Sequence, residues 1–196
     1  MRSPKELHDA IMKQLADYQP NWRLLRKLDK EWTGYVNGEG GNYYKWLALA
    51  VRIARPRKIL ELGTYTGTSA LMMYSEMPAE ASLVTVDKMR DRRFIPPEVY
   101  QDQRIGFVIG DDLNLSIYGA ASPSDIDFLF VDTEHRYAQV SREWRVYRDR
   151  LATEAYVVLD DLRLNDMYRF WDEVQYEKLE VTPDCHDSGF GFFLFR

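Results

Sequence analysis

From residue 58 onward, short apolar runs alternate with longer amphipathic segments, and this alternation constrains the fold more than any other feature. The apolar runs cover residues 58–62, 82–86, 104–109, 126–131 and 155–159. Segments with apolar residues at helical spacing cover residues 68–77, 137–151 and 165–174. A run that is apolar throughout is typical of a strand buried on both faces of a parallel sheet. Strands that alternate with helices therefore predict a doubly wound α/β sheet with helices on both faces.

Two final strands are expected close together near the C-terminus, at residues 176–182 and 190–195. They are joined through Pro183 and Gly189, so the connection is too short for a crossover helix and predicts an antiparallel pair. The complete set predicts a Rossmann-like, mostly parallel seven-stranded sheet whose last strand is antiparallel.

The N-terminal region is expected to be helical. Apolar residues spaced by four over residues 7–15 predict a helix that ends before Pro20. A second short helix is expected at residues 22–28. The glycines and asparagines of residues 36–42 predict a loop, and residues 43–53 form a strongly apolar helix.

We divide the chain into an N-terminal helical extension, residues 1–35, and a ligand-binding domain, residues 36–196. Trp22, Trp32 and Trp46 all lie in the first quarter of the chain. They could form a substrate-facing lid or a homodimer contact, or they could simply cover the sheet.

Charge and cysteine content exclude several classes of protein. The chain has 196 residues and a net charge of −5, which argues against nucleic acid as the partner because phosphate neutralisation needs concentrated Lys and Arg. Its single cysteine, Cys185, cannot form an intramolecular disulfide and favours a reducing compartment. No signal peptide and no run of ~20 apolar residues is visible, so we expect a cytoplasmic protein without membrane association.

The loop after the first strand, in the sequence KILELGTYTGTSALMM, has the position of a ligand-binding loop. Gly63 ends the strand and Gly67 opens the next helix, so the backbone can pass close to a ligand. A dinucleotide site needs G-x-G-x-x-G, but Tyr65 stands where the middle glycine would be, and the Gly-Lys-Ser/Thr of a phosphate-binding loop is absent. With Glu61 inside the strand end, this loop suits a positively charged ligand that has a nucleoside and no phosphate.

Acids follow the next two strands at the corresponding position. Asp87 ends the second strand, 26 residues after Glu61, and can accept both hydroxyls of a ribose. Asp111 and Asp112 follow the third strand, where an acid can accept from an adenine amino group. Each acid alone could instead cap a helix or turn.

The motifs ILELGTYTGTSAL, VTVD and VIGDD resemble those of the class I S-adenosylmethionine-dependent methyltransferases over most of the chain. The resemblance implies that Gly63 and Gly67 line the methionine part of the cofactor. It places Asp87 on the ribose and Asp111 by the adenine, with Glu61 acting on the methionine amino group. The full set of cofactor-binding residues expected on this basis is Glu61, Gly63, Thr64, Tyr65, Gly67, Thr68, Ser69, Asp87, Lys88, Gly110, Asp111, Asp112 and Asp132.

The stretch DFLFVDTEHRY ends a buried strand in an acid that has two counterparts after the next strand. Asp132 and the pair Asp160 and Asp161 should meet at neighbouring strand ends. Three carboxylates in one place raise one another's pKa unless a cation neutralises them. An all-oxygen ligand set suits Mg²⁺. The alternative is that Asp160 or Asp161 caps a helix and no metal binds.

His135 lies one turn beyond Asp132 and is expected to point into the same cleft. An imidazole is a natural base for a hydroxyl proton, so Asp132 and His135 are the candidate catalytic residues. A surface position at a helix start is the alternative for His135. His8 and His186 have no comparable setting, and His186 beside Cys185 does not make a zinc site.

The spacing of Asp132 and His135, and the double acid after the next strand, narrow the resemblance to metal-dependent O-methyltransferases. The sequence resembles catechol-type members, and especially macrolide-sugar and cephalosporin-hydroxylase-like members. This resemblance implies metal ligands at Asp132, Asp160 and Asp161, His135 as base, and a hydroxylated small molecule as acceptor. The sequence departs from this branch at two places. RLATEA replaces the usual Pro-Gly-Gly turn before the fifth strand, and Glu134 is the second departure.

Three alternatives remain open on the sequence. A metal-free methyltransferase acting on nitrogen or oxygen would use the acids only to bind cofactor or cap helices. A non-catalytic relative would keep the fold and work through its Trp-rich N-terminus. A nicotinamide dehydrogenase is disfavoured by the missing middle glycine.

Overall fold

The computed structural model describes the backbone of residues 1–196 and all side chains except those at positions 120 and 121. The strands are β1 Lys58–Leu62, β2 Ser82–Asp87, β3 Ile105–Ile109, β4 Ile126–Val131, β5 Leu151–Asp160, β6 Glu177–Glu180 and β7 Phe190–Phe195. The α-helices are α1 Pro4–Leu15, α2 Lys30–Asn37, α3 Tyr43–Ala54, α4 Thr68–Glu76, α5 Tyr137–Tyr147, α6 Met167–Glu173 and α7 Thr182–Cys185. Short 3₁₀ helices are η1 Val99–Gln101, η2 Leu115–Ala121 and η3 Arg148–Arg150.

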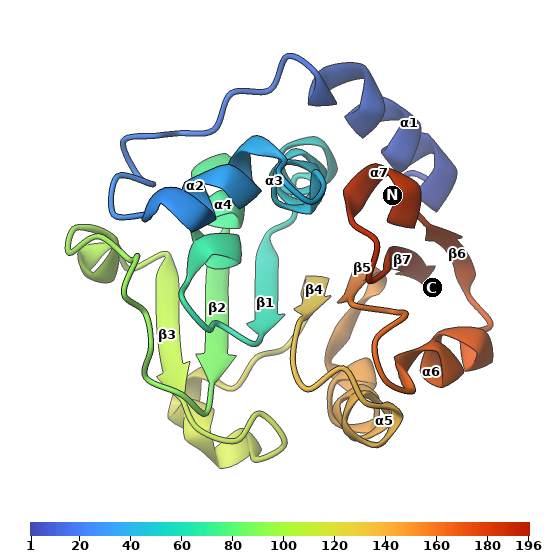
Figure 1. The fold of residues 1–196 in the computed structure, drawn as a ribbon. Coiled ribbons are helices and arrows are strands. Elements are labelled where there is room, and N and C mark those ends of the chain that lie inside the picture. The colour runs from blue at the N-terminus through green and yellow to red at the C-terminus, as the bar shows by residue number, and fades with distance from the viewer.

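Within this described chain, seven strands form one sheet in the order β3-β2-β1-β4-β5-β7-β6 (Figure 1). β1 to β5 pair in parallel, and β7 runs antiparallel to both β5 and β6. The sequence-based prediction of a mostly parallel sheet with an antiparallel last strand is therefore confirmed. β7 is inserted between β5 and β6, which brings the segment before β7 to the carboxyl end of β5.

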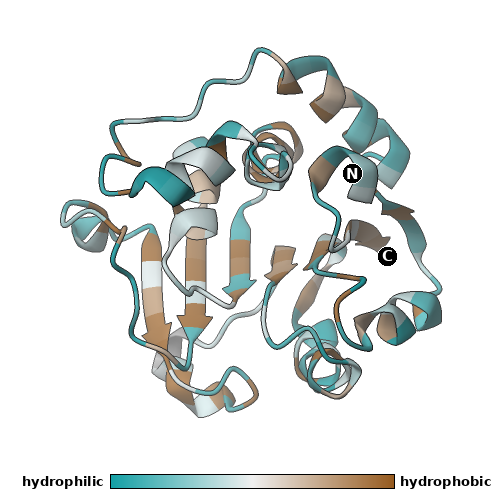
Figure 2. Cartoon of the chain, viewed as in Figure 1, coloured by the Kyte–Doolittle hydropathy of each residue, from teal (hydrophilic) through white to brown (hydrophobic). Residues whose placement is uncertain are grey.

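Two helical layers cover the sheet, and alternate residues of each strand face them (Figure 1). In β4, Phe128 and Phe130 pack in the core shared with α1, α3 and α4. Leu129 and Val131 pack in the opposite core, which α5 and α6 cover. Figure 2 shows the central strands mostly as hydrophobic segments, as strands buried on both faces require.

The N-terminal helices differ from the prediction in one element. α1 forms as expected: Ser3 and Glu6 make a capping box, and its apolar face is buried. The short helix expected at residues 22–28 is wrong, because that segment forms only hydrogen-bonded turns. A helix instead follows it: α2 begins after the cap residue Asp29 and ends at Gly38, whose φ of 107° is favourable only for glycine.

α2 covers residues on both sides of the proposed division at residues 35 and 36, so that division stays a prediction. Trp46 is fully buried against Phe190 and Phe192. Trp32 is partly buried on α2, and Trp22 is 38% exposed. The tryptophans therefore do not form one exposed patch, and the homodimer contact also stays a prediction. Within the described residues, no helix has both the length and the apolar character needed to cross a membrane.

Candidate active site

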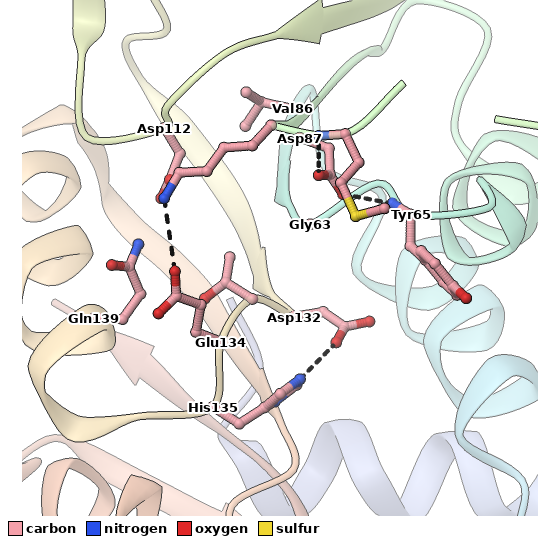
Figure 3. Close-up of a pocket in the computed structure, with 12 residues that line it drawn as sticks. Gly63, Tyr65, Val86, Asp87, Asp112, Asp132, Glu134, His135 and Gln139 are labelled. Carbon is pink, nitrogen blue, oxygen red and sulfur yellow. Dashed lines mark hydrogen bonds and ion pairs between the residues drawn. The ribbon is translucent and has the colours of Figure 1, made fainter. Parts of the chain in front are cut away.

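A cavity of about 400 Å³ opens at the carboxyl ends of the parallel strands (Figure 3). This is the edge at which doubly wound sheets bind ligands, since loops of different strands diverge there. Its lining comes from the loops after β1, β2, β3 and β4 and from the start of α5. The lining residues are Gly63, Tyr65, Val86, Asp87, Lys88, Met89, Asp112, Asp132, Thr133, Glu134, His135 and Gln139.

The loop between β1 and α4 supplies one wall of this cavity. Gly63 has a φ of 99°, and a Cβ there would collide with the main-chain carbonyl of Asp132. Asp87 holds the loop in place by accepting hydrogen bonds from the backbone N–H groups of Tyr65 and Met89, each at 2.7 Å. Gly67 shapes the start of α4 and faces Ile95, so it does not line the cavity.

Glu61 lies beneath this wall and is completely buried. Its Oε2 atom accepts a hydrogen bond from the Thr85 hydroxyl, and the Ser69 hydroxyl lies close to the carboxylate. Burial raises the pKa of Glu61 to about 7, although these two hydroxyls partly offset the effect. Among the described residues, its Oε1 atom has no hydrogen-bond partner. A buried acceptor without a donor is unfavourable, so a ligand donor at this atom would satisfy it.

The remaining residues predicted around Glu61 support the wall from behind. Thr64 shares a hydrogen bond of 2.5 Å with Thr85, and Thr68 lies 3.2 Å from the Thr66 hydroxyl. Thr64, Thr68 and Ser69 are all buried. None of the three lines the cavity, so any direct contact with a ligand there remains a prediction.

Only one of the two acids that follow β3 lies in the opposite wall of the cavity. Asp112 lines the cavity and is 6% exposed, whereas the side chain of Asp111 is 52% exposed and lies outside it. Lys88 spans the mouth, with its Nζ atom 3.7 Å from Asp111 and 3.7 Å from Glu134. Gly110 packs against Ile117 and does not line the cavity. Asp112 is therefore the acid that a ligand in the cavity would meet.

Asp132 and His135 meet as the sequence predicts. His135 Nε2 lies 3.5 Å from Asp132 Oδ1 and 3.5 Å from Asp161 Oδ2, and Figure 3 shows the imidazole directed at Asp132. His135 has a φ of 49°, which turns its side chain back toward the strand ends. Burial raises the pKa of Asp132 well above its ordinary range, and the charges of Asp160 and Glu61 raise it further.

A second cavity, of about 240 Å³, lies on the other side of this cluster. Asp160, Asp161 and His186 form its polar floor. Aromatic side chains of α2 and the start of α3 form its wall, and its remaining lining is Glu39, Gly40, Gly41 and Ser188. Trp32 packs with its ring centroid 5.8 Å from that of Tyr65, a residue of the first cavity. The two cavities are therefore neighbours on either side of His135, Asp132 and Asp161.

His186 is the site residue that sequence analysis missed. Its Nε2 atom lies 2.6 Å from Asp160 Oδ1, and its Nδ1 atom lies 2.6 Å from the Ser188 hydroxyl. Burial alone would lower the pKa of His186, but the hydrogen bond and charge of Asp160 outweigh it and raise that pKa. The only sequence signal was a histidine shortly before an apolar strand, and its importance depends on β7 pairing with β5.

Among the described side chains, one group brings three metal-binding atoms within 4.8 Å of one another: Asp160, Asp161 and His186. The group expected from the sequence contained Asp132 in place of His186. Two carboxylates and an imidazole fit a divalent cation chemically, and the raised pKa of Asp160 shows that burial disfavours its negative charge. Asp132 lies beside this group, because His135 Nε2 is 3.5 Å from both Asp132 Oδ1 and Asp161 Oδ2.

The fold and the first cavity define a doubly wound α/β domain that takes its ligand at the carboxyl ends of its central strands. Residues 60–162, just over half of the chain, match the family described as "Methyltransferase domain". The chain therefore belongs to the methyltransferase-domain family, which confirms the methyltransferase resemblance of its strand-end motifs.

Individual relatives agree with this assignment. The O-methyltransferase hkm8 of Aspergillus hancockii is 27% identical over 123 residues, which are 59% of this chain and 47% of that protein. The chain thus spans about half the length of this relative.

Solved structures show the same fold. The O-methyltransferase TomG of Streptomyces achromogenes, determined in complex with S-adenosylmethionine, has a TM-score of 0.67 and 17% identity, with both chains covered completely. The S-adenosylhomocysteine-bound methyltransferase PaMTH1 of Podospora anserina has a TM-score of 0.60 and 16% identity over 99% of this chain and 89% of its own. At these identities the likeness supports the fold alone.

Proposed function

We propose that this chain transfers the methyl group of S-adenosylmethionine to a hydroxyl oxygen of a small molecule. Membership of the methyltransferase-domain family supports methyl transfer, and the likeness to hkm8 supports oxygen as the acceptor. The observation that carries the proposal is the position of His135 between two cavities, with its Nε2 atom 3.5 Å from Asp161 of the second cavity. A cofactor in the first cavity and an acceptor in the second would meet at this histidine.

The first cavity suits this cofactor electrostatically. S-adenosylmethionine carries a sulfonium and an amino group, both positive, and no phosphate. Asp132 and Glu61 are acids whose buried charge is unfavourable without a cation nearby. Glu61 Oε1 is free to accept from the amino group, and Asp87 and Asp112 would accept from the ribose and the adenine. The complexes of TomG and PaMTH1 show that this fold can hold such a ligand.

The acceptor loses its proton as the new bond forms. In the proposed reaction the hydroxyl proton passes to Nε2 of His135 and the acceptor oxygen attacks the methyl carbon. The bond from carbon to sulfur breaks with its electron pair on sulfur, which leaves S-adenosylhomocysteine. A proton on Nε2 would lie beside carboxylate oxygens of Asp132 and Asp161, whose charge stabilises it. A positioned base of this kind contributes roughly 10²–10⁴ in rate.

Asp160, Asp161 and His186 would hold a divalent cation, with Asp132 as the further ligand expected from the sequence. Such a cation acts as a Lewis acid that stabilises negative charge developing on the acceptor oxygen. The imidazole makes this donor set less specific for Mg²⁺ than three carboxylates, since nitrogen donors also suit Mn²⁺, Fe²⁺ and Zn²⁺. Mg²⁺ remains our first candidate.

A metal-independent O-methyltransferase is the second candidate, and one contact favours it. His186 Nε2 lies 2.6 Å from Asp160 Oδ1, so a protonated imidazole there would balance this acid without a cation. Methyl transfer that survives exhaustive chelation would select this form.

The test is calorimetric titration of S-adenosylhomocysteine and S-adenosylmethionine into the protein, with EDTA, with Mg²⁺ and with Mn²⁺. We expect roughly micromolar affinity in every condition, about −8 kcal/mol. A separate metal-binding step should appear in the wild type and disappear in Asp161→Asn. Absence of binding of both nucleosides would overturn the proposed function.

A further inference from the structure

We infer that Glu143 is a positioning residue for the cofactor cavity: it donates a hydrogen bond from its carboxyl group to Asp112 and so holds Asp112 ready to accept from an amino group of the ligand. The inference rests on the proposed function, because it assigns a ligand to the first cavity. It adds a residue that lies outside that cavity and belongs to none of the motifs at the strand ends.

Glu143 and Asp112 form a buried pair of acids at the wall of the cavity. Glu143 lies on α5 and is 1% exposed, and Asp112 follows β3 and is 6% exposed. The two side chains lie within hydrogen-bonding reach of each other. Asp112 lines the cavity, whereas Glu143 stands behind it. A hydrogen bond between two carboxyl groups needs a proton, so one member of the pair is neutral when they share one.

The other contacts of Glu143 indicate which atoms share this proton. Gln139 Nε2 donates to Glu143 Oε1 at 2.8 Å, so that oxygen acts as an acceptor. Glu143 Oε2 and Asp112 Oδ2 are both buried, and among the described residues neither has a conventional donor. A proton carried on Glu143 Oε2 and donated to Asp112 would satisfy both atoms.

The surroundings favour Glu143 over Asp112 as the neutral member. Burial and the charge of Asp111 raise the pKa of Asp112, and the contact with Glu143 and the charge of Lys88, at the mouth of the cavity, oppose this rise. For Glu143, burial and then the charge of Asp112 raise the pKa to about 8, while hydrogen bonds from Gln139 and Thr133 lower it only in part.

Other polar groups around the pair are neutral or serve to fix it in place. Tyr147 donates to the main-chain carbonyl of Asp112 at 2.6 Å, and the Tyr118 hydroxyl lies 2.7 Å from that of Tyr147. Arg142 donates to Gln139 Oε1 at 3.0 Å, which orients the Gln139 amide so that its nitrogen faces Glu143. Among the described side chains, no salt bridge joins Glu143 to a cation, so a proton is what keeps Glu143 neutral beside Asp112.

The arrangement implies a dependence on pH that an isolated Asp112 would not have. Below about pH 8 the pair carries one negative charge, on Asp112, beside the cavity. Above that pH a second charge enters the same buried space, and the two carboxylates repel each other. Asp112 must then move away or take up a counter-ion. The ligand amino group thereby loses the carboxylate that accepted its hydrogen bond.

The experiment is calorimetric titration of S-adenosylhomocysteine between pH 6.5 and 9.5 into the wild type, Glu143→Gln and the matched control Glu177→Gln, an exposed acid of β6. The glutamine amide can donate to Asp112 and accept from Gln139 without ionising. We expect wild-type affinity to fall about tenfold above pH 8, with the same fall in Glu177→Gln. Glu143→Gln should match the wild type at pH 7 and lack the wild-type fall above pH 8.

Three results would overturn the inference. Wild-type affinity could show the same pH profile as Glu143→Gln, or Glu143→Gln could bind markedly more weakly at pH 7 while remaining folded. Alternatively, the ¹³C resonance of the Glu143 carboxyl group could titrate below pH 6, which would exclude the neutral carboxyl without any ligand. Failure of the wild type to bind at pH 7 would instead overturn the proposed function and the positioning role together, so the two failures are distinguishable.

Discussion

At the scale of single residues, this site is a collection of acids that the fold forces together. Glu61, Asp132, Asp160 and Asp161 approach one another at the strand ends, and burial or mutual repulsion raises the pKa of the first three. Two histidines lie among them, His135 against Asp132 and Asp161 and His186 against Asp160. Such a site favours a cationic ligand, because each added positive charge reduces the cost of the buried carboxylates.

Substitution of His135 tests the base at this scale. His135→Ala should reduce turnover at least about 100-fold, because no other imidazole lines the first cavity among the described residues. The affinity for S-adenosylhomocysteine should stay within about threefold, since the proposed role of the side chain is in proton transfer. Turnover is measured on whichever hydroxylated acceptor a library screen identifies. A loss of less than about threefold would remove His135 from the mechanism.

At the scale of elements, α2 and the segment before β7 complete the site. α2 places Trp32 and Tyr35 on the wall of the second cavity, and the segment before β7 places His186 on its floor. Neither element belongs to the parallel strands that carry the cofactor motifs. The second cavity, which we propose holds the acceptor, therefore depends on elements that the motifs do not predict.

The cap of α2 offers a test at this scale. Asp29 Oδ1 accepts a hydrogen bond of 3.0 Å from the Trp32 backbone N–H. Asp29→Ala should lower the free energy of unfolding by about 1 kcal/mol and loosen the wall that Trp32 provides. We expect a higher KM for the acceptor and little change in cofactor affinity. Urea denaturation and steady-state kinetics measure the two effects.

Asp29→Asn is the matched control, because asparagine caps helices about as well as aspartate. It should restore both the stability and the KM. If Asp29→Asn were as damaging as Asp29→Ala, the effect would come from the charge of Asp29 and the capping explanation would be wrong.

At the scale of the whole molecule, the buried acids make stability depend on pH. The pKa of Glu61 is raised to about 7 and that of Glu143 to about 8, and Asp132 and Asp160 shift in the same direction. An unfolded chain ionises these groups near their ordinary values, so as pH rises from about 4.5 to about 8 the unfolded state releases protons that the folded state retains. The free energy of unfolding should therefore fall as pH rises through this range.

Urea denaturation of the chelator-treated protein at pH 5.5, 7 and 8.5 measures this trend. The double variant Glu61→Gln, Glu143→Gln should show a shallower decline, because two of the shifted groups no longer titrate. Stability that rises between pH 5.5 and 8.5, or a decline that is equally steep in the double variant, would contradict the explanation.

Much of the fold and half of the site could be predicted from the sequence. The strands were predictable because a strand buried on both faces must be apolar at every position, as in Phe128 to Val131. The approach of Asp132 to His135 was predictable as well, since His135 follows Asp132 by only three residues. Both come directly after a parallel strand, at the edge where such strands end. α2 was missed because its glycine and polar residues weaken the helical pattern, and its cap and packing against α3 stabilise it.

The sequence by itself determined which strands form and that acids gather at their carboxyl ends, because these properties follow from local apolar runs and from the direction of parallel strands. Only the tertiary structure decided which acids meet which partners. Asp112 faces the cavity and Asp111 does not, because the turn after β3 directs neighbouring side chains apart. His186 reaches Asp160 because β7 pairs with β5 across a long separation in the chain. Contacts of this kind depend on strand order, which no local pattern encodes.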